Sequence, residues 1–137
     1  MKRILFVLCL AAAFPLSAVN INDTRLLTDP AISGNRIAFA YANDLWTANA
    51  DGTNVQRLTS HPGVEYGPKF SPDGALIAFT GNYDGNTDVY IIPAAGGVPK
   101  RLTTHPGRDV ALDFTPDGGA VLFTSPREVY TSRYLQL

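Results

Sequence analysis

The chain has 137 residues, enough for one domain at most, and its 11 Lys and Arg nearly balance its 12 Asp and Glu. The sequence shows no basic stripe of the kind that binds nucleic acid and no acidic tail. Twelve Gly and ten Pro, together with many β-branched and aromatic residues, favour a turn-rich β protein over a helical one.

The first residues read as a targeting segment. Two basic residues precede an apolar run from Ile4 to Phe14, and small residues follow up to Ala18. This order predicts a secretory signal peptide over residues 1–18, cleaved near Ala18, and a periplasmic or secreted location. The run is too short to span a bilayer, which takes about 20 apolar residues in a helix. No membrane contact is expected after cleavage, and Cys9 is read as part of the signal.

Residues 67–80 predict a strand, a tight turn and a second strand. The turn is Ser71–Gly74, in which Pro fixes one φ, Asp accepts a backbone hydrogen bond and Gly supplies a positive φ. The same unit returns 44 residues later as Thr115–Gly118, followed by the apolar run 121–124. The chain therefore contains an internal repeat.

Other segments recur at the same offset. The matching segments are Asp44-Leu45-Trp46 with Asp88-Val89-Tyr90, Arg57-Leu58-Thr59 with Arg101-Leu102-Thr103, and His61-Pro62-Gly63 with His105-Pro106-Gly107. An earlier copy, shortened in its loops, starts near Arg25. In the middle copy four strands are expected, at 67–70, 75–80, 87–93 and 98–103. The connections, such as 81–86, are of hairpin length, so neighbouring strands are antiparallel.

Four-stranded antiparallel units at a period of about 40–45 residues are typical of β-propeller blades. We therefore predict an all-β fold, a partial β-propeller over residues 19–137, with blades at 25–59, 61–103 and an incomplete one at 105–137. A β-sandwich stays possible, although it would not require the same turn at a fixed period. About two and a half blades cannot close a ring of 4–8. We expect a fragment of a longer protein, the alternative being self-association through open blade edges.

The repeat also gives the aromatic residues and the histidines equivalent positions in successive blades. Trp46 and Tyr90 hold equivalent places in the third strand, where packing between blades is expected rather than stacking on a ligand. His61 and His105 occupy equivalent turns, and neither has Cys or Glu beside it at metal-ligand spacing. We predict that they are turn residues, not metal ligands.

Several acidic residues are candidates for a binding site or a pore lining. Asp84–Asp88 resembles the start of a calcium loop, but Val89 and Ala95 stand where the loop needs Gly and Glu, so a hairpin connection is expected. Asp109 and Asp113 lie near the innermost strand of the third blade, where they either line a pore or, by default, face solvent. No nucleophile elbow, P-loop or dinucleotide fingerprint occurs. No catalytic, cofactor-binding or metal-binding residue is predicted, and no cofactor.

The repeats resemble the WD-like propeller repeats of TolB, tricorn-type proteases and prolyl-oligopeptidase-like enzymes. The resemblance rests on Phe70–Gly74, Ile77-Ala78-Phe79, Asp88-Val89-Tyr90 and Gly96–Thr103. The opening from Pro30 to Trp46 and the tail from Phe123 to Leu137 are similar to the first and third blades of tricorn-type proteases.

This resemblance implies a function in which the propeller filters or channels peptides toward a separate serine-peptidase region. That region is not in the chain, so no catalytic residue carries over. The partners implied are peptide or protein substrates and the missing peptidase region in cis. A TolB-like periplasmic interaction module and the propeller of an exported amidohydrolase are the alternatives.

Overall fold

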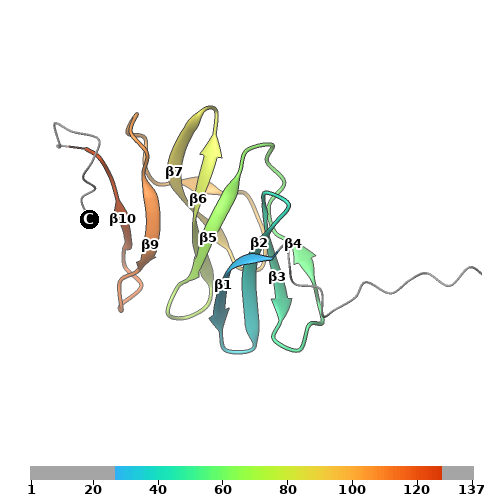
Figure 1. Ribbon diagram of the computed structural model, residues 1–137. Coiled ribbons are helices and arrows are strands. Elements are labelled where there is room, and N and C mark those ends of the chain that lie inside the picture. Colours follow the sequence, from blue (N-terminus) through green and yellow to red (C-terminus); the bar gives the residue numbers. More distant parts are fainter. Residues whose placement is uncertain (1–26, 128–137) are drawn as a thin grey trace, which may run out of the picture.

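A computed structural model describes residues 27–127, and all regular secondary structure in that range is β-strand. The strands form three antiparallel sheets that lie side by side, with β9 and β10 at one end and β1–β4 at the other (Figure 1). Blade 1 consists of β1 (Thr28–Ser33), β2 (Arg36–Tyr41), β3 (Asp44–Asn49) and β4 (Gln56–Arg57). Blade 2 consists of β5 (Glu65–Phe70), β6 (Leu76–Tyr83), β7 (Asn86–Pro93) and β8 (Lys100–Arg101). Blade 3 contains β9 (Val110–Phe114) and β10 (Val121–Thr124).

In each sheet the strands pair in sequence order, so every connection is a hairpin. The innermost strands β1, β5 and β9 contact one another in turn, and within residues 27–127 the three blades form an open ring. The all-β, partial β-propeller prediction is confirmed. The predicted signal peptide over 1–18 and the tail 128–137 lie outside the described residues. Within the described range, no helix has the length and apolar character needed to cross a membrane.

The turn between the first two strands of a blade has the predicted chemistry. Gly74 has a φ of 71°, and its amide donates to the carbonyl of Ser71 over 2.8 Å. The carboxylate of Asp73 accepts hydrogen bonds from the hydroxyl of Ser71 (2.6 Å) and the amide of Ala75 (3.0 Å). Thr115–Gly118 repeats the arrangement in blade 3. Local sequence therefore determines this turn.

The predicted connection over 81–86 is wrong. β6 continues to Tyr83, which pairs with Asn86, and the turn consists of Asp84 and Gly85 alone. Their φ values of 54° and 83° are both positive, as a two-residue type I′ turn requires, and Asp-Gly suits that turn. The tight turn lets the hydrogen-bond ladder run further than the apolar pattern indicated. β5 likewise begins earlier than predicted, at Glu65.

The main apolar core lies between blades 1 and 2. Because side chains alternate along a strand, Ala38 and Ala40 point to one face of β2 and meet Phe79 and Tyr90 of the next blade. Phe79 is fully buried, and its ring lies 5.6 Å from that of Tyr90, centroid to centroid. Burying a side chain of this size stabilises the fold by roughly 1.5–3 kcal/mol. Small residues on one blade thus receive aromatic residues from the next.

The loop that links blades 1 and 2 passes very close to β6. A Cβ atom on Gly63 would lie 1.9 Å from the carbonyl oxygen of Asn82, and the amide of Asn82 donates to Val64 over 2.8 Å. Glycine is therefore required by contact rather than by φ. A Cβ atom on Gly107, its copy in the next loop, would lie 2.5 Å from a ring carbon of Pro126. Close contact therefore accounts for the glycine of the repeated His-Pro-Gly.

We expect Gly63→Ala to destabilise the fold by about 1–3 kcal/mol, because the added methyl group forces two backbone segments apart. The measurement is the midpoint of thermal unfolding followed by circular dichroism. Gly119→Ala is the matched control, since a Cβ atom there meets Asp117 only at 3.4 Å or more. Equal shifts of the two midpoints would contradict the close approach.

Candidate functional site

Two of the repeated motifs are contact partners. Asp44, at the start of β3, forms a salt bridge of 2.8 Å with Arg57 of β4. In blade 2 the equivalent Asp88 pairs with Arg101. The aspartates are buried, whereas each arginine is more than one-third exposed. The acidic and basic motifs therefore close each blade at its outer strand.

The threonine of each Arg-Leu-Thr motif ties the chain back to the third strand. The hydroxyl of Thr59 accepts from the amide of Leu45 over 2.9 Å, and that of Thr103 accepts from the amide of Val89 over 3.0 Å. Thr103 also donates to Asp88 over 3.1 Å. The chain then crosses to the next blade.

A second buried acid begins the first strand of the next blade. Glu65 and Asp109 stand 44 residues apart and make the same backbone hydrogen bond, from their amides to the carbonyls of Asn43 and Thr87, each over 2.9 Å. Both side chains are almost completely buried. Each junction between blades therefore contains a buried carboxyl group.

At the first junction this carboxyl group is held by neutral donors. The hydroxyls of Thr59 and Tyr83 donate to Glu65, and the amide of Leu45 lies 3.3 Å from it. Among residues 27–127, no Lys, Arg or His pairs with Glu65. In the same range one oxygen of the neighbouring Asp44 accepts no hydrogen bond.

These surroundings change the titration of the acid. Burial raises the pKa of Glu65 above its ordinary value, the hydrogen bonds from Thr59, Tyr83 and Leu45 act to lower it, and the charge of Asp44 raises it further. Burial also raises the pKa of Tyr83, and the hydrogen bond to Glu65 raises it further. Burial therefore outweighs the three hydrogen bonds and makes the carboxyl group of Glu65 harder to ionise than an exposed one.

At the second junction the buried carboxyl group is paired with a cation. Arg127 forms a salt bridge of 2.5 Å with Asp109, and its guanidinium carbon lies 4.9 Å from the centre of the Phe123 ring. Arg127 stands 44 residues after Tyr83, so the same place in the repeat supplies either a phenol or a guanidinium. The two junctions share a geometry and differ in the partner of the buried carboxyl group.

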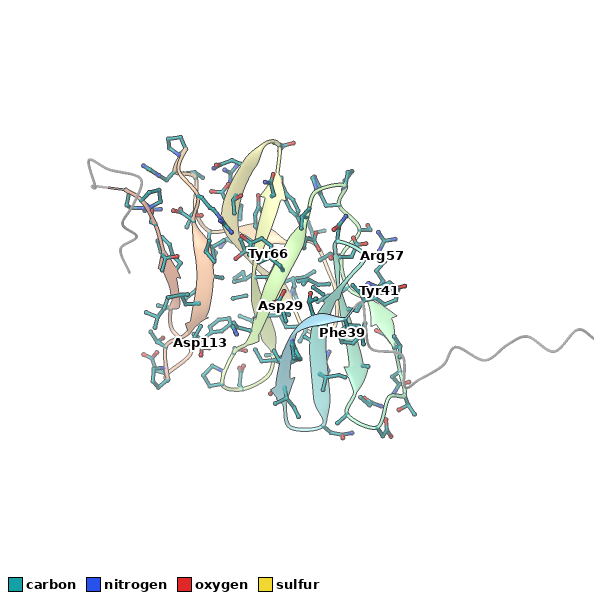
Figure 2. All side chains as sticks on the ribbon, viewed as in Figure 1. Asp29, Phe39, Tyr41, Arg57, Tyr66 and Asp113 are labelled. Atoms are coloured by element: carbon teal, nitrogen blue, oxygen red, sulfur yellow. The ribbon has the colours of Figure 1, made fainter. Side chains whose placement is uncertain are left out.

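A cavity of about 340 Å³ opens beside the first junction, between β1, β5 and the β2–β3 turn. Its lining residues are Thr28, Ala40, Tyr41, Ala42, Asn43, Val64, Glu65 and Tyr66. Figure 2 shows Tyr66 on β5 and Tyr41 near the end of β2. Arg108 donates to the Tyr66 hydroxyl over 2.9 Å and lies 5.9 Å from its ring centre. Aromatic walls and an exposed cation suit a peptide side chain or carboxylate.

The rim of this cavity is strained. Ala42 and Asn43 form the β2–β3 turn with φ values of 53° and 71°. Blade 2 uses Asp84 and Gly85 at the same place. The left-handed conformation costs an Ala residue about 1–2 kcal/mol. Residues in such strained conformations cluster near functional sites. We therefore take this cavity as the candidate site.

The two histidines lie in separate turns. The Nδ1 atoms of His61 and His105 accept hydrogen bonds of 3.0 Å from the amides of Gly63 and Gly107. The ring of His61 also stacks on Tyr83, at 3.8 Å between centroids. The part of the chain that the structure describes contains no group of three His, Cys, Asp or Glu side chains placed to hold a metal ion.

The acidic residues singled out in the sequence lie in different environments. Within Asp84–Asp88, the first two residues form the hairpin turn and Asp88 is buried against Arg101, so the hairpin interpretation holds. Asp113 is exposed near the β9–β10 turn (Figure 2). The default expectation that Asp109 faces solvent is wrong, because Arg127 pairs with it in the interior.

Packing between blades is confirmed for Tyr90, which is 4% exposed in the core between blades 1 and 2. Trp46 lies on the opposite face of blade 1 from that core, half-buried, and its ring N–H donates to the carbonyl of Tyr41 over 3.1 Å. It is not among the residues packed in the core between blades 1 and 2.

The residues that sequence reasoning missed are Glu65 and Tyr83. The signal was present, because the 44-residue offset aligns them with Asp109 and Arg127. An acid whose copy is also an acid, at the start of a strand, indicates a structural site. The change from Tyr to Arg concealed it.

The family comparison decides the identity of the repeats. Residues 24–137 match the family model of the tricorn protease N-terminal beta propeller domain. The chain belongs to this tricorn propeller family. The Tricorn protease homolog 1 of Streptomyces coelicolor is 36% identical over 64 residues, which is 47% of this chain and 6% of that protein.

Solved structures agree with the tricorn propeller assignment. The crystal structure of the tricorn protease matches with a TM-score of 0.65 and 28% identity, over 74% of this chain and 11% of that chain. TolB from Acinetobacter baumannii matches with a TM-score of 0.64 and 28% identity, over 75% of this chain and 27% of that chain. The chain thus spans a small part of each relative.

Glu65→Gln should remove a pH dependence of stability. Because burial raises the folded-state pKa of Glu65 above the ordinary 4.5, the stability it contributes is complete below that value and is lost as the pH rises through the raised pKa. We expect the unfolding midpoint of the native chain, relative to that of Glu65→Gln, to fall between pH 4 and pH 8.

Asp51→Asn is the control, because the contribution of Asp51 changes only below this pH range and its midpoint difference should stay constant within it. Hydrogen bonds from Thr53 lower the pKa of the exposed Asp51 below 3.8, so its contribution is present above 3.8 and is lost as the pH falls. A midpoint difference for Glu65→Gln that stays constant, or grows with pH, would contradict a raised pKa.

Proposed function

We propose that the chain is the substrate-access or scaffolding propeller of an exported, periplasmic tricorn-like peptidase. In this proposal the proteolytic residues lie in a region that follows Leu137. The observation that carries it is the family match over residues 24–137. Within 27–127 the Nδ1 atom of each histidine accepts a hydrogen bond from a glycine amide of its own turn, which is consistent with a non-catalytic module.

The cavity beside the first junction supports contact with peptides. Tyr41 and Tyr66 line the cavity with aromatic surface. Arg108 lies outside the lining but contacts Tyr66, so it offers a cation beside the cavity for a carboxylate. Innermost strands surround the axis of a propeller, so a chain that passes along that axis would meet this cavity. The expected ligand is therefore an extended peptide with an apolar or acidic side chain.

Tyr66→Ala should weaken the binding of fluorescein-labelled casein peptides more than about fivefold, the effect of losing about 1 kcal/mol from an aromatic anchor. Fluorescence anisotropy with the full chain gives the affinity, and Val98→Ala is the control because Val98 is 87% exposed and lies outside this cavity. Absence of saturable binding, or equal affinities for the two variants, would contradict the proposed peptide contact.

The similarity to TolB favours a second candidate, a periplasmic interaction module without a peptidase region. Sequencing the gene beyond codon 137 distinguishes the two. An open reading frame that continues into a peptidase region supports the first candidate, whereas a stop codon with no peptidase gene in the locus contradicts it. Export is tested separately by mass spectrometry of the secreted product, which should begin near Val19.

A further inference from the structure

A second cavity, of about 470 Å³, lies between the outer edges of blades 1 and 2. One wall is the segment 58–62, which follows β4 of blade 1, and the other is the loop 97–99 with Arg101 of β8. Its volume is in the range of pockets that hold small molecules, about 300–1,000 Å³. It shares no lining residue with the cavity beside the first junction. The two are therefore separate places on the described chain.

Aromatic rings form the floor of this second cavity. The rings of Tyr83 and Tyr90 lie 4.5 Å apart, centroid to centroid, and the ring of His61 stacks on that of Tyr83 at 3.8 Å. All three residues line the cavity, and the two tyrosines are buried. Because aromatic rings attract one another in offset and tilted arrangements, a flat aromatic ligand suits this floor.

The charged and polar groups of the lining are hydrogen-bond donors. The Nδ1 atom of His61 accepts from the amide of Gly63, so a neutral His61 carries its ring proton on Nε2, which is a donor. Arg101 donates from Nε to Thr103 and from Nη2 to Asp88, and within residues 27–127 its Nη1 atom has no partner. The arginine side chain is 37% exposed. None of the described lining residues is Asp or Glu, so the lining favours an anion.

The aromatic floor is specific to this junction. At the offset of 44 residues, Arg127 stands in the place of Tyr83 and pairs with Asp109. His105 repeats the hydrogen bond of His61 to a glycine amide, so the turn is kept in the next copy while the phenol is not. Packing of one blade on the next therefore does not require the aromatic floor.

We propose that the second cavity binds a small aromatic carboxylate. The ring of the ligand lies against the aromatic side chains, and its carboxylate accepts from Nη1 of Arg101 and from Nε2 of His61. The ligand would contact blade 1 through the segment 58–62 and blade 2 through β8. The site goes beyond the proposed peptide contact and uses none of the residues that line the cavity beside the first junction.

The test is isothermal titration calorimetry of the full chain with 2-naphthoate, and with 2-naphthamide as an uncharged ligand of the same shape. Saturable binding of the carboxylate is expected. The amide should bind about tenfold more weakly, because hydrogen bonds to an ionised acceptor are the stronger kind. Absence of saturable binding, or equal affinities for the two ligands, would overturn the proposal.

Val98→Glu adds a carboxylate at the mouth of the cavity without disturbing the core, because Val98 lines the cavity and is 87% exposed. The added charge should weaken 2-naphthoate binding about fivefold by repulsion. Val98→Gln is the neutral control of the same size. Val55→Glu places the same charge on a 56% exposed residue outside the lining. Both controls should bind within about twofold of the unchanged chain, and equal affinities of Val98→Glu and Val98→Gln would contradict the site.

Tyr66→Ala separates this proposal from the proposed peptide contact. Tyr66 lines the cavity beside the first junction and not the second cavity, so this variant should bind 2-naphthoate as the unchanged chain does. Loss of 2-naphthoate binding by a Tyr66→Ala chain that is folded by circular dichroism would place the ligand in the other cavity and overturn the proposal. Failure of the casein-peptide measurement leaves the 2-naphthoate result unaffected.

Discussion

A buried carboxyl group at the start of a blade's first strand joins that blade to the one before it. Glu65 does this at the first junction by accepting hydrogen bonds from Thr59 and from the amide of Leu45, both contributed by blade 1. The apolar contact between Ala40 and the aromatic residues of blade 2 lies against this polar cluster. Because a buried acid is costly unless it is paired or hydrogen-bonded, the cluster requires the two blades to meet in one arrangement.

The two junctions satisfy the same requirement by different chemistry. Tyr83 donates to Glu65, whereas Arg127 pairs with Asp109. Removing one partner of a buried ion pair leaves an uncompensated charge and costs about 3–5 kcal/mol. The first junction uses neutral donors instead of a cation, and burial raises the pKa of Glu65 there. The candidate cavity is lined by Glu65 itself, so the chemistry of the junction also determines the shape of the site.

Much of this fold could be predicted from local sequence. The Ser71–Gly74 turn and its copy specify a hairpin by themselves, and the 44-residue offset specifies blades. The length of β6 could not be judged from apolar pattern alone, because Asn82 is polar and exposed although it continues the ladder. Glu65 has no local signature, since its partners come from two blades. The only sequence signal for Glu65 was its place in the repeat, opposite Asp109. Trp46 shows the limit of such alignment, because it is half-buried although its copy Tyr90 is buried between blades.

The coupling between Glu65 and Thr59 across the first junction tests this account most directly. A double-mutant cycle would measure the free energy of unfolding of Glu65→Leu, Thr59→Val and the double variant by urea denaturation at pH 5. The account predicts a double variant that costs less than the sum of the singles by about 0.5–3 kcal/mol, because neither buried partner is then left without the other. Additive single effects would contradict the claim that the buried acid joins the blades.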